Sequence, residues 1–175
     1  MMKRWVRSVA ILPALALGAC GFQPLYGTLD SGMGVGMALS EVYVDPIPDR
    51  VGYELRNNLL DLFNATGRAD TASYRLKLYL TGAEDAVVLQ PNTAITRYNV
   101  TLRAHYDLVP KGKTESVKSG EVTAFAAYNV AAAPFLYATV TAQRDAQNRA
   151  ASDIAERIHV ELAVYLREAA MTAAR

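Results

Sequence analysis

Reactive and metal-binding side chains are scarce in this sequence of 175 residues, which has one cysteine and two histidines. A single cysteine excludes an intramolecular disulfide and any zinc or iron–sulfur site built from clustered cysteines. A large excess of charges of one sign is also missing, because 18 basic residues nearly balance 17 acidic ones. Sequence-independent nucleic-acid binding needs a basic field that displaces counterions from phosphates. The composition therefore gives no support to a nucleic-acid-binding protein.

The two histidines belong to no catalytic or metal-binding motif. His105 lies in an alternating stretch typical of a strand, and His159 lies in a stretch typical of a helix. Neither has a second ligand at metal-binding spacing, and no serine has the flanking glycines of a nucleophile elbow. We expect a partly exposed His159, no enzymatic activity, no metal and no cofactor.

The N-terminal segment differs from the rest of the chain. Three basic residues within the first seven precede an apolar run over residues 9–19, which is too short to span a bilayer as a helix. The run ends in LGAC at residues 17–20, which resembles the lipobox of bacterial lipoproteins. In that family the cysteine is lipidated and becomes the first mature residue. We therefore expect a signal peptide over residues 1–19 and lipid attachment at Cys20.

A glycine-rich stretch follows the cysteine. Residues 27–36, GTLDSGMGVG, contain four glycines and show no periodicity, which is typical of a flexible tether. A phosphate-binding loop would require Gly-Lys-Ser/Thr after its spacer, or a preceding strand, and both are missing. We expect a lipidated tether over residues 20–36 and a single domain over residues 37–175. In bacterial lipoproteins an aspartate directly after the cysteine often means retention at the inner membrane. This sequence has Gly21 there, so the resemblance implies the outer membrane.

Alternating apolar and polar residues predict four strands. The first covers residues 37–45 and ends at two prolines, and the next two cover residues 73–83 and 93–109. The last covers residues 114–128, where a slip of the pattern at Gly120 indicates a bulge.

Two segments have the three- and four-residue spacing of amphipathic helices. The first begins at Asp49 as a capping residue and ends near Gly67, and the second runs from residue 134 to about residue 170. The second would be about 50 Å long, so its first half should project or lie against a partner. The order β-α-β-β-β-α predicts an α+β two-layer sandwich: a four-stranded, mostly antiparallel sheet with two helices packed on one face.

The polar face of the predicted sheet collects positive charge. Lys77 and Arg97 have no evident acidic neighbour, so an anionic ligand is the sharper hypothesis for them. The candidate binding residues are the cations of this face and of the following corner: Arg75, Lys77, Arg97, Arg103, Lys111 and Lys113.

Cross-strand ion pairs are the alternative for two of these cations. A three-residue loop at residues 111–113 would place Arg103 opposite Glu121. A turn centred on residue 91 would place Arg75 opposite Asp107.

Two motifs connect the sequence to a known family. The lipobox cysteine opens the run CGFQPLYG at residues 20–27, and the late helix contains QRDAQ at residues 143–147 and continues to Ile158. Together with the order of strands and helices, these motifs resemble the LptE family, the lipoproteins of the lipopolysaccharide translocon.

The resemblance implies an outer-membrane lipoprotein that plugs the lumen of a large β-barrel, LptD. Such a protein assists assembly of the barrel and helps deliver lipopolysaccharide to the outer leaflet. It implies acyl chains on Cys20 at the periplasmic side, and cations that contact lipopolysaccharide phosphates or the barrel wall. Two other functions stay open: an adaptor of an inner-membrane lipid exporter, and a lipoprotein hydrolase.

Overall fold

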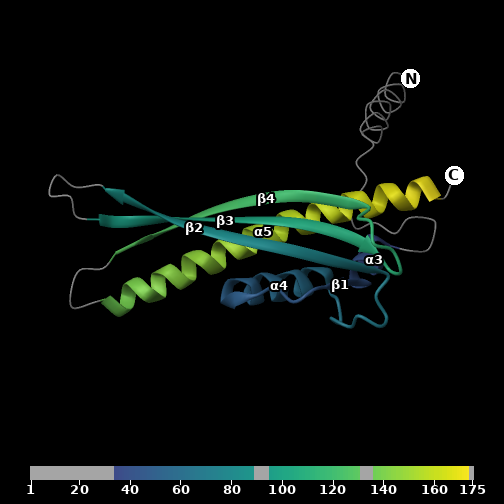
Figure 1. Ribbon diagram of the computed structural model, residues 1–175, viewed down its shortest axis with the longest axis horizontal. Helices are drawn as coiled ribbons and strands as arrows, with labels where there is room; N and C mark the ends of the chain where they lie inside the picture. The colour runs from purple at the N-terminus through teal and green to yellow at the C-terminus, as the bar shows by residue number, and fades with distance from the viewer. Residues whose placement is uncertain (1–33, 89–94, 131–135, 174–175) are drawn as a thin grey trace, which may run out of the picture.

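The computed structural model describes residues 34–88, 95–130 and 136–173 (Figure 1). Its elements follow the chain in this order: α3 (Val35–Ser40), β1 (Val42–Val44), α4 (Asp49–Phe63), β2 (Tyr74–Val88), β3 (Ile95–Pro110), β4 (Lys118–Asn129) and α5 (Leu136–Ala173).

The four strands form one sheet in the order β1-β2-β3-β4. β1 pairs with β2 in parallel, and the other two pairs are antiparallel. α4 and α5 pack on one face of this sheet, so the expected two-layer α+β fold is confirmed. The short helix α3 is an addition that the sequence pattern did not predict.

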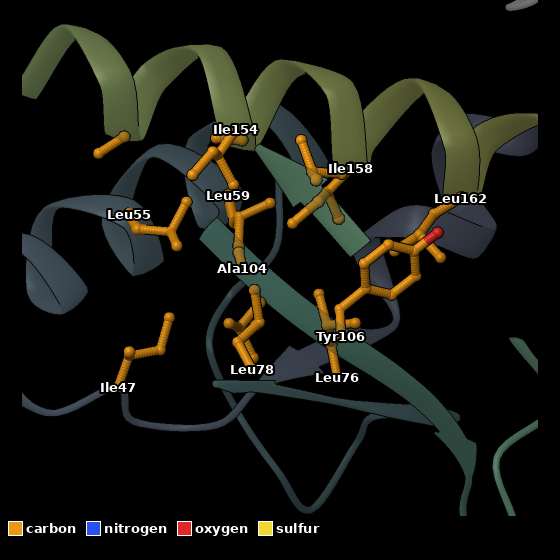
Figure 2. Close-up of a cluster of buried hydrophobic side chains, with 14 of the residues drawn as sticks. Ile47, Leu55, Leu59, Leu76, Leu78, Ala104, Tyr106, Ile154, Ile158 and Leu162 are labelled. Atoms are coloured by element: carbon orange, nitrogen blue, oxygen red, sulfur yellow. The ribbon is translucent and has the colours of Figure 1, made fainter. Parts of the chain in front are cut away.

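The alternation along the strands places apolar side chains against the helices and polar side chains on the outer face of the sheet. Leu76 and Leu108 are fully buried on the inner face. Figure 2 shows Ile154, Ile158 and Leu162 of α5 pointing from the helix toward the sheet and α4. All three are fully buried, so the core lies between α5, α4 and the sheet.

A tyrosine explains the glycine of β4. Tyr106 is fully buried, and a Cβ atom added at Gly120 would lie 2.6 Å from its hydroxyl oxygen. The pairing of β3 with β4 is continuous through Gly120, so the predicted bulge is wrong. The slip in the pattern instead reflects the need for a residue without a side chain at position 120, which leaves space for the Tyr106 ring. The Tyr106 hydroxyl donates a hydrogen bond to Glu161 of α5, and burial raises the pKa of this tyrosine.

The structure corrects the predicted first strand. Residues 37–40 belong to α3, and the first strand is limited to β1. Val35 and Leu39, one helical turn apart, are both buried, whereas Met37 between them is 55% exposed. A strand would place all three on one face, so this burial pattern fits a helix. The expected signal peptide and Cys20 lie outside the described residues, as does most of the expected tether, whose last two residues begin α3.

The end of α4 also differs from the prediction. Asn64 adopts a left-handed conformation with φ of 50°, and its backbone N–H donates to the carbonyl oxygen of Asp61 at 3.1 Å. The helix therefore ends at Phe63, four residues before Gly67, because asparagine tolerates this conformation better than most residues.

The two ends of the sheet are covered differently. We call the end where β1 pairs the proximal end and the end formed by residues 82–88 and 97–102 the distal end. Figure 1 shows α5 along the whole sheet, whereas α4 lies nearer the proximal end and only its first residues reach the start of the distal end. Tyr137 in the first turn of α5 is 82% exposed, but Ala146 and Ala150 are buried, so the first half of this helix packs on the sheet and does not project as expected. Among the described residues, no helix is both long and apolar enough to cross a membrane.

Candidate functional site

Four of the six predicted cations line one pocket at the proximal end of the sheet. The pocket has a volume of about 430 Å³ and opens between the start of β2, the end of β3 and the loop that follows β3. Its charged lining residues are Arg75, Lys77, Lys111 and Lys113.

The backbone brings these four side chains together. Arg75 and Lys77 are alternate residues of β2 and therefore share its outer face. The backbone N–H of Lys111 donates to the carbonyl oxygen of Ser73 at 2.9 Å, which holds the loop against the start of β2. Gly112, with φ of 77°, turns the chain so that Lys113 also lines the pocket.

One cation of the pocket is held in place by its neighbours. The Arg75 Nε atom lies 3.4 Å from an Asp45 carboxylate oxygen, and its guanidinium lies 5.8 Å from the centre of the Tyr43 ring. The carboxylate compensates the charge of Arg75, so this residue shapes the pocket wall.

The charges of the three lysines are not compensated by a carboxylate in the way that the charge of Arg75 is. Lys111 donates from its Nζ atom to the carbonyl oxygen of Asp70 at 2.7 Å, a contact that orients the ammonium without neutralising it. The Arg68 guanidinium bound to Asp70 holds the pKa of that carboxyl below its ordinary value. Within the described part of the chain, Lys77, Lys111 and Lys113 form no ion pair.

The neighbour of Lys77 across the sheet is already engaged. The expectation that Lys77 has no acidic neighbour is wrong, because Lys77 lies directly opposite Asp107. The Asp107 carboxylate accepts a hydrogen bond from Ser119 at 2.5 Å and lies 3.6 Å from His105. Three ammonium groups around one pocket can therefore bind a phosphate or another multivalent anion.

The predicted pairing of Arg75 with Asp107 is wrong, because Arg75 lies opposite Val109. A one-residue irregularity between Val87 and Val88 shifts the pairing near the turn, and the turn itself lies outside the described residues. The shift in the body of the hairpin is an even number of residues, so the polar face was nevertheless predicted correctly.

The two remaining predicted cations lie outside the pocket. Arg103 forms the predicted pair with Glu121 at 3.5 Å, although its directly opposite residue is Thr123 and the pair is diagonal. Arg97 lies at the distal end and lines another hollow of the outer face. The six cations therefore form no single site.

Sequence reasoning missed the aromatic wall of the pocket. Tyr43 lies beside Arg75 because β1 pairs with β2 in parallel. A parallel pair formed by a three-residue strand leaves no turn signal in the sequence, so only the structure places Tyr43 here.

The histidines lie on opposite sides of the sheet. His105 is on the outer face, whereas His159 is 8% exposed and packs against Phe63 with ring centres 5.9 Å apart. The expected partial exposure of His159 is therefore wrong, and burial lowers its pKa. In the described residues, no three His, Cys, Asp or Glu side chains are placed to hold a metal ion together.

The fold and the pocket define a small α+β domain with a lysine-lined surface pocket. The sequence model of the LptE family, described as lipopolysaccharide-assembly, matches residues 39–162. The chain belongs to the LptE family, as the motifs of its sequence predicted.

Solved structures share the fold. A putative lipoprotein from Caulobacter crescentus is 26% identical with a TM-score of 0.64, over 77% of this chain and 96% of that chain. A minor lipoprotein from Acinetobacter baumannii is 16% identical with a TM-score of 0.53, over 71% and 89%. The rare lipoprotein B from Shewanella oneidensis is 14% identical with a TM-score of 0.53, over 73% and 95%. A comparison with curated proteins finds no significant match.

Proposed function

We propose that this protein is a non-enzymatic, lipid-anchored subunit of the lipopolysaccharide translocon of the outer membrane. It plugs an LptD-like β-barrel, assists assembly of that barrel and helps pass lipopolysaccharide to the outer leaflet. The observation that carries the proposal is membership of the LptE family over residues 39–162. The lipobox at Cys20 supports attachment to the periplasmic face of the outer membrane through acyl chains.

The proximal pocket supports direct contact with lipopolysaccharide. Its phosphates are multivalent anions, and three lysines without an ion pair in the described structure surround a cavity that admits them. Hydrogen bonds to charged groups contribute about 1.5–3 kcal/mol each. We expect Lys77→Glu combined with Lys111→Glu to weaken lipopolysaccharide binding by tenfold or more, measured by isothermal titration calorimetry.

Arg144→Glu is the control matched to each lysine reversal made singly, because every one of these changes shifts the net charge by the same amount. Arg144 is exposed on α5 and does not line the pocket, so its reversal changes the net charge without changing the site. Equal effects of the control and of the lysine variants would contradict binding at the pocket.

The partner is tested separately by co-purification. We expect a tag at the C-terminus to recover a stoichiometric β-barrel of several times this mass in mild detergent. Recovery of an inner-membrane lipid exporter instead, with fractionation at the inner membrane, would contradict the proposal.

A further inference from the structure

A second hollow lies on the outer face at the distal end of the sheet. Its volume is about 500 Å³, and residues of β2, β3, β4 and α5 line it. The strand pairing arranges its neighbourhood in three cross-strand rows: Ala83, Thr101 and Phe125; Asp85, Asn99 and Ala127; Val87, Arg97 and Asn129. Because Ala127 in the middle row is small, space is left between Phe125 and the next row.

An aromatic ring forms one wall of this hollow. Phe125 is 73% exposed, although its neighbours on this face are mainly polar. A fully buried phenylalanine side chain contributes about 1.5–3 kcal/mol, so a ligand that covers this ring gains part of that energy. Single exposed apolar side chains are normal on protein surfaces, so the polar groups around Phe125 distinguish this hollow from an ordinary surface.

The other walls carry donors and acceptors that are free to bind a ligand. Asp85, Asn99 and Arg97 line the hollow, and no hydrogen bond or ion pair engages their side chains in the described part of the chain. Arg149 is fixed at the rim, where it donates to the carbonyl oxygen of Ala127 at 3.1 Å and pairs with Asp145 of its own helix. An acceptor and several donors therefore face the space beside the ring.

We propose that this hollow binds a sugar ring of an anionic glycan. The apolar C–H face of the sugar packs on Phe125, its hydroxyls bind Asp85 and Asn99, and an acidic substituent binds Arg97. An acyl chain does not fit, because Asn99 and Thr101 interrupt the apolar surface. Free phosphate would use Arg97 but would leave the ring uncovered.

The position of the hollow separates it from the proximal pocket. Lys77 and Asp85 share the outer face of β2 and lie eight residues apart, which corresponds to roughly 26 Å along the strand. The inference rests on the proposed function, since the glycan is then the sugar portion of lipopolysaccharide. One ligand can span the face with its phosphates in the pocket and more distant sugars in the hollow.

The test uses two probes: core oligosaccharide released from lipopolysaccharide by mild acid, and lipid A in detergent. We expect the full chain to bind both, and Phe125→Ala to weaken oligosaccharide binding about tenfold while lipid A binding stays unchanged. Lys77→Glu should show the reverse pattern. Tyr137→Ala, which removes an exposed aromatic ring from α5, is the control and should change neither.

Arg97→Gln provides a second variant at the hollow and should also weaken oligosaccharide binding. If the chain binds lipid A but not the oligosaccharide, or if Phe125→Ala binds the oligosaccharide as tightly as the unmodified chain, the inference is wrong and the proposed function stands. If neither probe binds, the proposed contact with lipopolysaccharide fails together with the inference.

Discussion

The two ends of the sheet are built differently, although the same three strands and the same helix run through both. At the proximal end, Leu76 and Tyr106 are fully buried beneath α5 and α4 (Figure 2). Leu108, which pairs with Leu76, is fully buried as well. At the distal end, residues 82–86 of β2 are exposed, including those on the face toward the helices.

Hydrogen bonds supplement a thinner apolar core at the distal end, where Val100 and Leu102 are still buried. Glu84 accepts hydrogen bonds from Tyr128 at 3.1 Å, from Gln143 at 2.9 Å and from Gln147 at 3.0 Å. The Arg50 guanidinium also bonds to Gln147, which links α4 to this cluster. The difference indicates that the proximal end supplies most of the stability of the domain, whereas the distal end presents an extended surface over a thinner core.

The largest effect is expected from a substitution that shortens a buried side chain of the proximal core. We expect Ile158→Ala to lower the free energy of unfolding by about 2–5 kcal/mol, because a buried cavity is left behind. Urea denaturation measures this loss. Val160→Ala, two residues further along α5 at a side chain that is 49% exposed, should cost less than about 1 kcal/mol. Equal costs would show that α5 does not contribute its stability through the proximal core.

The second test breaks the hydrogen-bond cluster at the distal end. Glu84→Gln keeps the shape of the side chain but leaves one acceptor oxygen for three donors. We expect a loss of about 1–3 kcal/mol, with faster hydrogen exchange in residues 141–150 of α5 and unchanged exchange near Ile158. Asp85→Asn is the control, because Asp85 lies on the outer face. A uniform rise in exchange along α5 would contradict the division between the two ends.

The alternation of the strands was enough to predict the two faces of the sheet, because a side-chain period of two fixes which residues share a face. It could not predict that Val35 and Leu39 form a helix, since a single turn is too short to give a periodic signal. Nor could it predict that the Tyr106 ring leaves no room for a side chain at Gly120, because that contact depends on the pairing of two strands. The glycine was therefore interpreted as a bulge.

The candidate site was predicted as a list of charges but not as an arrangement. The positions of Arg75 and Lys77 on one face follow from local alternation, and Lys111 and Lys113 follow from the corner sequence. The pocket itself depends on the loop after β3 folding back to Ser73, a contact between residues far apart in the sequence. The same dependence on long-range pairing explains why Arg97 was grouped with residues at the other end.

The third test uses pH at the proximal end. Burial lowers the pKa of His159, so the unfolded chain binds more protons than the folded chain below the ordinary histidine pKa of about 6.5. The stabilisation is complete above that pH and falls as the pH decreases toward the lowered folded value. We expect His159→Leu to flatten this decline in urea midpoints between pH 7.5 and 5, and His105→Leu on the exposed outer face to leave it in place. An unchanged slope in His159→Leu would contradict a neutral buried imidazole.

The smallest effect is expected on the outer face between the two sites. Arg103 and Glu121 form an ion pair with side chains 59% and 54% exposed, so solvent and salt screen it. We expect Arg103→Gln to change the free energy of unfolding by less than about 1 kcal/mol, and to leave the binding of lipid A and of the core oligosaccharide unchanged. In high salt the free energy of unfolding of this variant should equal that of the unmodified chain, because salt screens the attraction between Arg103 and Glu121. A clear loss of binding to either probe would show that the middle of this face contacts the ligand, and that the pocket and the hollow are parts of one continuous site.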